Sequence, residues 1–119
     1  MVLIIDDNKN FANRIVAMLK ELDTVGNIEV ALSYEEGHRL FMEQQPRIVL
    51  LDINLPGKSG IELLKLIKQS EYNCEVIMIT NHSGSFYRQL CTDLGAGYFL
   101  DKTHDFDLVP GIISKQVLN

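Results

Sequence analysis

The chain has 119 residues, a length typical of one domain and too short for two complete cores, so we expect a single domain over residues 1–119. Its formal net charge of -5 argues against direct binding of nucleic acid, which needs basic side chains to neutralise phosphates. No apolar run is long enough to span a membrane, and the first residues lack the basic flank of a signal peptide, so we expect a soluble, cytoplasmic protein without a membrane partner.

The first part of the chain alternates apolar runs with amphipathic segments. Val2–Ile5 is continuous, apolar and rich in β-branched residues, which is typical of a strand covered on both faces. Three- and four-residue apolar spacings then predict a helix, carried by Phe11, Ile15, Met18, Leu19 and Leu22. In residues 28–32 the large apolar side chains alternate with Glu and Ala, which is typical of a strand at the edge of a sheet. Ser33 and Glu36 then have the spacing of a capping box, which predicts a second helix.

The middle of the chain repeats this alternation. Ile48–Leu51 predicts a buried strand, and Ser59 with Glu62 predicts a second capping box before a helix over residues 61–67. Val76–Ile79 is a further apolar run that predicts the fourth strand. Each of these two strands is followed directly by a polar residue of potential chemical use.

The last third predicts two helices around a fifth strand. Apolar residues Phe86, Leu90 and Leu94 predict the core face of the fourth helix, and residues 98–100 predict the strand. A final helix places Phe106, Val109, Ile113 and Val117 on one face. Its pattern is compatible with Pro110 and Gly111 only if both lie in its first turn.

Five strands alternating with five helices predict a doubly wound α/β fold, because each parallel crossover needs a helix to return the chain. Right-handed crossovers, together with the wetter pattern of the second strand, favour the flavodoxin-like order 2-1-3-4-5. In such sheets ligands bind beyond the carboxyl ends of the strands.

Five polar residues fall at these carboxyl ends, on four different strands. Asp6 and Asp7 follow the first strand, Asp52 the third and Thr80 the fourth, while Lys102 follows the fifth. Three carboxylates at one edge need a counter-charge, and Mg²⁺ suits them because it takes hard oxygen ligands. The lysine and the threonine hydroxyl would then stabilise phosphoryl transfer to the central aspartate.

Four stretches carry a resemblance to a known family: "LIIDDN", "IVLLDINLPGKSGIELLKLIK", "VIMIT" and "GAGYFLDK", in this order. They resemble the CheY-like receiver domain of bacterial response regulators, the phosphoacceptor module of two-component and phosphorelay signalling, over nearly the whole chain. The resemblance implies that Asp52 accepts the phosphoryl group, that Thr80 is the switch hydroxyl and that Lys102 is the site lysine. It also implies a rotating aromatic at Phe99 and a loop glycine at Gly60.

The same resemblance implies Mg²⁺ as the cofactor, with Asp7 and Asp52 as direct ligands, Asp6 acting through water, and the main-chain carbonyl of Asn54 completing the set. It implies phosphoryl donation by a sensor histidine kinase, a histidine phosphotransfer protein or a small acyl phosphate. The implied readout surface is the fourth helix, fifth strand and fifth helix, which would meet an output protein that the sequence does not name. The implied chemistry is confined to transfer onto Asp52 and hydrolysis from it, so the domain is not expected to be an enzyme.

Three positions depart from the family pattern. Asn81 stands where a small residue is usual, which predicts narrower access to the site. Thr103 stands where proline is usual after Lys102, and a cis bond before a residue other than proline costs about 2.5–4 kcal/mol, so both isomers are considered. Phe99 has no hydroxyl, so only packing would stabilise an inward rotamer.

These departures keep open an alternative, a receiver-like module that binds partners independently of phosphorylation. A Mg²⁺-dependent phosphatase with an aspartyl-phosphate intermediate is disfavoured, because Asp6 and Asp7 are adjacent and 119 residues leave no room for a cap. A flavin-binding protein would need a hydroxyl-rich loop where "DDNKN" stands. Among the remaining reactive residues, His82 and His104 are expected to be exposed loop histidines. The resemblance implies that the position of His82 influences the lifetime of the phosphorylated state. Cys74 and Cys91 are expected to be ordinary thiols.

Overall fold

Five parallel strands form one sheet in the order β2-β1-β3-β4-β5. The computed structural model describes residues 1–23, 25–82 and 84–118. The strands are β1 (Val2–Ile5), β2 (Ile28–Ala31), β3 (Ile48–Leu51), β4 (Glu75–Thr80) and β5 (Tyr98–Asp101). The predicted doubly wound fold and its strand order are therefore confirmed.

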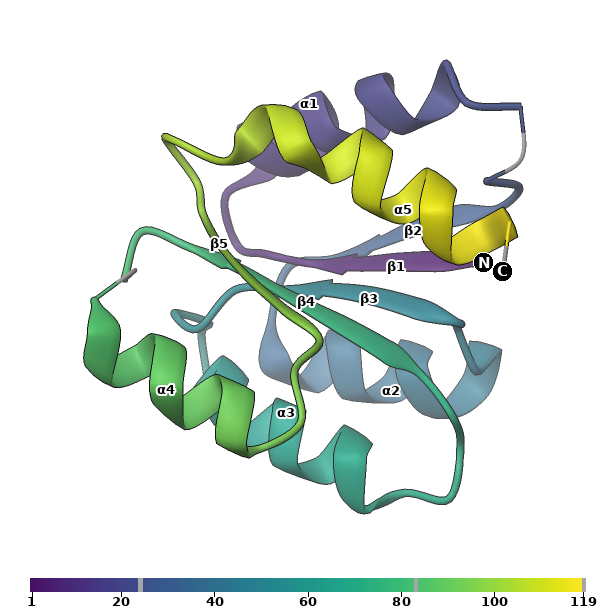
Figure 1. Ribbon diagram of the computed structural model, residues 1–119. Helices are drawn as coiled ribbons and strands as arrows, with labels where there is room; N and C mark the ends of the chain where they lie inside the picture. The colour runs from purple at the N-terminus through teal and green to yellow at the C-terminus, as the bar shows by residue number, and fades with distance from the viewer. Residues whose placement is uncertain (24, 83, 119) are drawn as a thin grey trace.

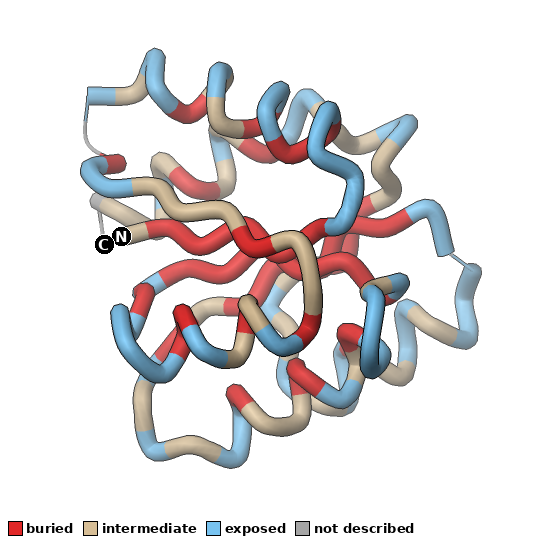
Figure 2. The backbone as a smooth tube through the Cα atoms, turned by 180° about the vertical axis from the view of Figure 1, so that it is seen from behind, coloured by how far each residue is buried: buried red, intermediate tan, exposed pale blue. Residues whose placement is uncertain are grey.

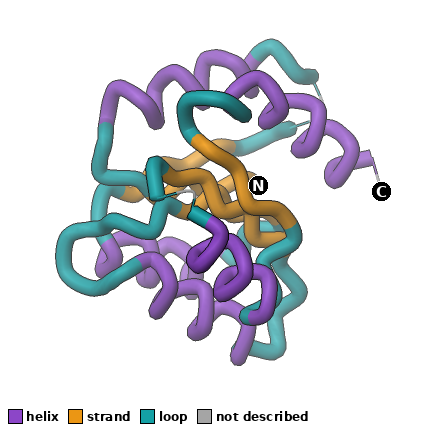
Figure 3. The backbone as a smooth tube through the Cα atoms, turned by 60° about the vertical axis from the view of Figure 1, so that its left-hand side comes forward, coloured by secondary structure: helices purple, strands orange, loops and turns teal. Residues whose placement is uncertain are grey.

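Helices cover both faces of this sheet (Figure 1, Figure 3). One face carries α1 (Lys9–Lys20) and α5 (Val109–Leu118), and the other carries α2 (Tyr34–Gln44), α3 (Gly60–Gln69) and α4 (Ser85–Asp93). A short 3-10 turn, η1 (Phe106–Leu108), leads into α5. No helix within the described ranges combines the length and the apolar character that a membrane crossing demands.

The core is divided by the sheet into two apolar clusters, because successive strand residues point to opposite faces. Leu3, Val49 and Met78 belong to the cluster under α2, α3 and α4. Their neighbours Ile4 and Leu50 belong to the cluster under α1 and α5. Figure 2 shows the strands as the buried centre of the molecule. Burying a side chain of this size contributes about 1.5–3 kcal/mol, which explains why the strands read as unbroken apolar runs.

Serine side chains cap the first turns of α2 and α3. The Ser33 hydroxyl accepts from the Glu36 amide at 3.2 Å, as the capping pattern predicts. The prediction for Ser59 is wrong in detail, because its hydroxyl accepts from Ile61 at 3.1 Å rather than from Glu62. The Glu62 carboxylate instead reaches Lys65, one turn further along α3, at 3.5 Å.

The expectation that Phe86 belongs to the core is wrong, because its side chain is 71% exposed. Tyr87 and Cys91 carry the inward stripe of α4, and Leu94, just past the end of the helix, packs against the core as predicted. Adjacent residues differ by about 100° around a helix, so inward Tyr87 turns Phe86 outward.

Both cysteines are buried and free, in agreement with the expectation of ordinary thiols. Burial raises the pKa of Cys91, and it raises that of Cys74 to about 12, so both thiols stay protonated near neutral pH.

Pro110 and Gly111 lie in the first turn of α5, where the sequence pattern required them. A proline is tolerated there because the first helical turn leaves its amides without intrahelical partners. Phe106, predicted on the same helix, lies in η1 and packs edge-on against Phe11 of α1, with ring centroids 5.6 Å apart.

Candidate functional site

Strand register brings the predicted site residues to one edge of the sheet. Ile5 of β1 pairs with Leu51 of β3, so the next residues, Asp6 and Asp52, leave the sheet side by side. Thr80 of β4 pairs with Asp101 of β5, and Lys102 follows one residue later. The main chain is tied across these ends, with the amide of Asp52 donating to the Ile5 carbonyl at 3.0 Å and that of Lys102 to the Thr80 carbonyl at 3.1 Å.

A buried lysine bridges two aspartates at this edge. The Nζ atom of Lys102 lies 2.7 Å from Oδ2 of Asp6 and 2.9 Å from Oδ2 of Asp52. It also lies 4.6 Å from the ring centroid of Phe11, whose face adds a favourable cation–π contact. Asp7 is exposed at the rim, and one carboxylate oxygen from each of Asp6, Asp7 and Asp52 lies within 4.8 Å of the others.

Burial and ion pairing shift two pKa values at the site. Burial raises the pKa of the Asp6 carboxyl above 3.8, an effect that the contact with Lys102 and the hydrogen bond from Asn8 oppose only in part. Burial by itself would lower the pKa of Lys102, but contact with the Asp6 and Asp52 carboxylates raises it above 10.5. The lysine is therefore a fixed positive charge at neutral pH.

The donor set fits a small divalent cation. Three carboxylates face a single ammonium group, which leaves about two negative charges uncompensated. Oδ1 of Asp6 accepts from the Asn8 amide at 2.8 Å. Its buried Oδ2 meets Lys102 as an ion pair but accepts no directed hydrogen bond from the residues that the structure describes. Clustered carboxylate oxygens are the ligands that Mg²⁺ prefers.

The Thr80 side chain is buried at the carboxyl end of β4, and its hydroxyl oxygen accepts a hydrogen bond from the His82 amide at 3.1 Å. His82 is exposed, as predicted, but it makes a contact that the sequence does not reveal. The side-chain amide nitrogen of Asn54 lies 2.6 Å from Nε2 of His82, with the amide as the natural donor. This contact joins the loop after β3, which contains Asp52, to the loop after β4.

Phe99 is buried, with its side chain only 6% exposed. Arg88 of α4 holds it in two ways: Nη1 donates to the Phe99 carbonyl at 3.0 Å, and Cζ lies 5.0 Å from the ring centroid. Sequence reasoning missed Arg88, because one arginine on an amphipathic helix gives no periodic signal.

The loop after β5 resolves the question raised by Thr103. No peptide bond among the described residues is cis, so the bond from Lys102 to Thr103 is trans. A groove of about 440 Å³ opens beside the lysine, between α1 and this loop, and is bordered by Asn8, Arg14 and Asn81.

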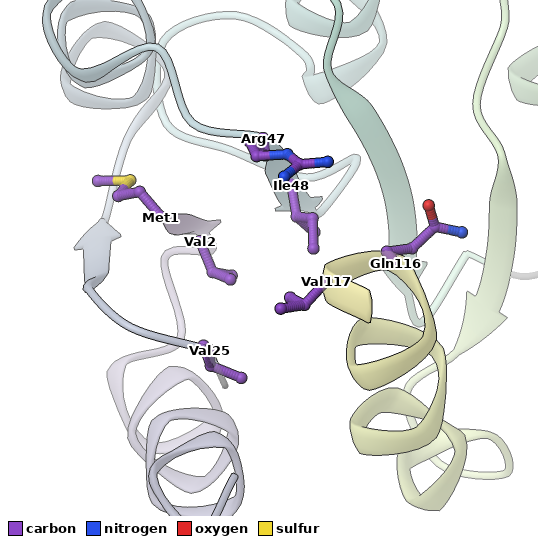
Figure 4. Close-up of a pocket in the computed structure, with 7 residues that line it drawn as sticks. All are labelled: Met1, Val2, Val25, Arg47, Ile48, Gln116 and Val117. Atoms are coloured by element: carbon purple, nitrogen blue, oxygen red, sulfur yellow. The ribbon is translucent and has the colours of Figure 1, made fainter. Parts of the chain in front are cut away.

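A second hollow lies at the opposite edge of the sheet and has a volume of about 180 Å³. Figure 4 shows Val2, Val25, Ile48 and Val117 around it. Apart from Arg47, the described residues that line it have no charged side chain. Its lining thus contrasts with the carboxylate cluster at the carboxyl edge.

Comparison with known proteins agrees with this geometry. The family model for the response regulator receiver domain matches residues 2–113. The chain is 28% identical over 103 residues to the DNA-binding transcriptional activator EvgA of Escherichia coli (strain K12), covering 84% of this chain and 48% of EvgA. It is also 28% identical over 106 residues to the transcriptional regulatory protein DltR of Streptococcus agalactiae serotype III (strain NEM316), covering 89% and 46%. The chain therefore spans about half the length of these curated relatives.

A solved structure extends the likeness to three dimensions. The signal receiver domain of the DNA-binding response regulator merR from Colwellia psychrerythraea 34H superposes with a TM-score of 0.92 at 27% identity, covering 99% of this chain and 98% of that one. The family match spans both the sheet and the acidic edge described above. The chain therefore belongs to the response regulator receiver domain family, the signalling domains of two-component systems.

Proposed function

We propose that this receiver domain is a phosphorylation-dependent switch that accepts a phosphoryl group on Asp52. The observation that carries the proposal is the contact of one lysine with two carboxylates, at 2.7 Å from Asp6 and 2.9 Å from Asp52. Asp52 shares the carboxylate cluster with Asp6 and Asp7, and the neighbouring strand β4 ends in the buried Thr80. The arrangement supports nucleophilic attack by a carboxylate beside a fixed positive charge.

In the proposed reaction an oxygen of Asp52 forms a bond to the phosphorus of a donor. The bond from phosphorus to the leaving group breaks, and the leaving group departs with that electron pair. The Lys102 ammonium stabilises charge on the phosphoryl oxygens, and the Thr80 hydroxyl donates a hydrogen bond to one of them. Attack of water on the same phosphorus later releases inorganic phosphate and regenerates the carboxylate. This self-directed transfer and hydrolysis is the whole of the proposed chemistry, and no external substrate is processed.

Asp6, Asp7, Asp52 and the main-chain carbonyl of Asn54 would hold Mg²⁺. When bound, the ion neutralises negative charge on the phosphoryl oxygens during transfer. With the ion bound, ionised Asp6 would no longer be destabilised by repulsion from the Asp52 carboxylate. The groove beside Lys102 gives a donor a route to the acceptor from the α1 side.

The proposed readout begins at two buried side chains, Thr80 at the end of β4 and Phe99 in β5. A phosphoryl group on Asp52 attracts the Thr80 hydroxyl, which must release the His82 amide that it now accepts. Movement of this loop changes the packing around Phe99 and its contact with Arg88. The altered surface is the α4-β5-α5 face, which an output protein would recognise.

The proposed donor is a sensor histidine kinase or a histidine phosphotransfer protein, and the proposed setting is the cytoplasm. The DNA-binding description of EvgA applies to a protein about twice as long as this chain. With a net charge of -5, residues 1–119 are proposed to act as one receiver domain that meets proteins and contacts neither nucleic acid nor membrane directly.

The test uses acetyl phosphate and Mg²⁺ with intact mass spectrometry. We expect one added phosphoryl group on the wild type and on Asp93→Asn, an exposed aspartate of α4, and none on Asp52→Asn. Beryllofluoride with Mg²⁺ should shift the amide resonances of Thr80 and Phe99 in the wild type and in Asp93→Asn, and leave them unchanged in Asp52→Asn. An adduct of equal yield on Asp52→Asn would refute Asp52 as the acceptor.

A second candidate is a module that binds its partner independently of phosphorylation. The contact between Asn54 and His82 favours it, because it joins the loops after β3 and β4 and so narrows one approach to Asp52. Under this alternative neither acetyl phosphate nor beryllofluoride changes the spectrum, and partner affinity is the same for Asp52→Asn and the wild type.

A further inference from the structure

The geometry points to Asp101 and Asp105 as positioning residues for Lys102, an inference that rests on the proposed phosphoryl chemistry. Asp101 is the last residue of β5, and beyond it the chain leaves the sheet in a turn over residues 102–104. The lysine that pairs with two carboxylates therefore stands at the start of a turn, and a single main-chain bond, from its amide to the Thr80 carbonyl at 3.1 Å, ties it to the sheet. Further contacts must fix the rest of the turn.

Two aspartate side chains enclose this turn. Oδ1 of Asp101 accepts from the amides of Thr103 at 2.8 Å and His104 at 2.9 Å. Oδ2 of Asp105 accepts from the amide of Asp101 at 2.8 Å, while the amide of Asp105 donates to the Asp101 carbonyl at 2.9 Å. We call these four hydrogen bonds the aspartate clasp. Hydrogen bonds to ionised carboxylates are short and strong, so the clasp is a stiff closure of the turn.

The clasp involves the residues directly before and directly after Lys102 in the sequence. The amide of Lys102 donates to the Thr80 carbonyl at 3.1 Å, and the two amides that follow belong to the clasp. Three successive main-chain amides are thus fixed, and the side chain is aimed from a rigid base at Asp6 and Asp52. Thr103 takes part through an amide N–H, which a proline at that position would lack.

The clasp affects position more than folding. Thr103 and His104 are exposed, so water can satisfy their amides once the Asp101 carboxylate is removed. The fold then survives, but the turn gains alternative conformations and the ammonium group is no longer aimed. A misplacement of about 1 Å in a reacting constellation costs on the order of a hundredfold in rate.

The experiment compares four variants of the full chain with the wild type. Asp101→Ala removes the acceptor of two clasp bonds, whereas Asp101→Asn keeps an amide oxygen that accepts the same two bonds. Asp105→Ala removes a single bond. Asp23→Ala is the matched control, because it deletes an exposed carboxylate that does not line the groove beside Lys102 and for which the described part of the chain shows no hydrogen bond or ion pair. Circular dichroism and urea unfolding verify that each variant folds.

We expect the phosphorylation rate with acetyl phosphate and Mg²⁺ to fall at least about tenfold in Asp101→Ala, and to return to near wild type in Asp101→Asn. The affinity for Mg²⁺, followed by amide chemical shifts, should not weaken, because the clasp supplies no ligand to the cluster. The ammonium resonance of Lys102 in metal-free protein should be sharp in the wild type, in Asp101→Asn and in Asp23→Ala. It should be lost in Asp101→Ala through exchange with water.

Each outcome separates this inference from the proposed function. If the wild type accepts no phosphoryl group while the ammonium resonance still follows the pattern above, the proposed function fails and the clasp stands. A wild-type rate and spectrum in Asp101→Ala would overturn the clasp while leaving the function intact. Asp101→Asn as slow as Asp101→Ala would overturn it as well, since charge would then be the cause. Should Asp101→Ala not fold, Asp105→Ala against Asp105→Asn provides the same comparison.

Discussion

Replacing Lys102 by methionine would leave two buried carboxylates without their shared counter-charge. The ammonium now lies 2.7 Å from Asp6 and 2.9 Å from Asp52, and its side chain is only 9% exposed. At an effective dielectric constant of about 20, unit charges at these separations attract by about 6 kcal/mol per pair. Desolvation of the three groups opposes this gain, and removing one partner of a buried pair typically costs about 3–5 kcal/mol.

We therefore expect Lys102→Met to lower the free energy of unfolding in metal-free buffer by about 3 kcal/mol or more, a large share of the 5–15 kcal/mol typical of a domain. Protonation of Asp6 limits the loss, because burial already raises the pKa of this carboxyl. Added Mg²⁺ should restore more stability to Lys102→Met than to the wild type, since metal and ammonium compete for the same oxygens.

The assay is urea unfolding followed by far-ultraviolet circular dichroism, in chelator and in millimolar Mg²⁺. Lys115→Met is the matched control, because Lys115 is exposed on α5 and its loss should change stability by no more than about 0.5 kcal/mol. The electrostatic argument is refuted if the two variants unfold at the same urea concentration in chelator, or if Mg²⁺ stabilises both equally.

Four further variants test other parts of the structure. In chelator, the stability of Asp6→Asn relative to the wild type should increase as pH rises from 3.8 through the raised pKa of Asp6. The reason is that the folded wild type loses stability as this buried carboxyl ionises. If burial of Asp6 were unimportant, urea unfolding curves at acidic and at neutral pH would give the same difference between the two proteins. Gly60→Ala should destabilise by about 3 kcal/mol, since its Cβ atom would lie 1.9 Å from the main-chain carbonyl oxygen of Asp52. Gly111→Ala, with open space around it on α5, should stabilise by about 0.5–1 kcal/mol, and thermal melts that rank the two in reverse would contradict this. His82→Ala should still accept phosphate but lose it up to about ten times faster, because its contact with Asn54 no longer restricts water, and an unchanged half-life would remove this role.

The sequence predicts the sheet and the acidic edge well, because both follow from strong local signals. A strand buried on two faces must be apolar throughout, as in Val2–Ile5, and the carboxyl ends of parallel strands must share one edge. These two rules suffice to bring Asp6, Asp52 and Lys102 together without knowledge of any side-chain conformation.

Other features depend on tertiary placement and give no such signal. On α4 the spacing of Phe86 and Leu90 is as helical as that of Tyr87 and Cys91, so periodicity alone does not decide which stripe faces the sheet. Arg88 meets Phe99 across eleven residues of sequence, and only the packing of α4 against β5 creates this contact. The aspartate clasp is local, yet aspartates in a turn are too common to predict which amides they accept.

The partition of the core into two clusters has a consequence for how such a domain transmits information. Lys102 rests on Phe11 in the layer of α1 and α5, whereas Phe99 is buried in the layer of α2, α3 and α4. The hydrogen-bonded sheet thus separates the contact of Lys102 in one layer from the buried Phe99 ring in the other, whereas the proposed output face, with α5 in the first layer and α4 in the second, spans both. A core substitution under α4 should therefore alter the packing of Phe99 more than the contact between Lys102 and Phe11.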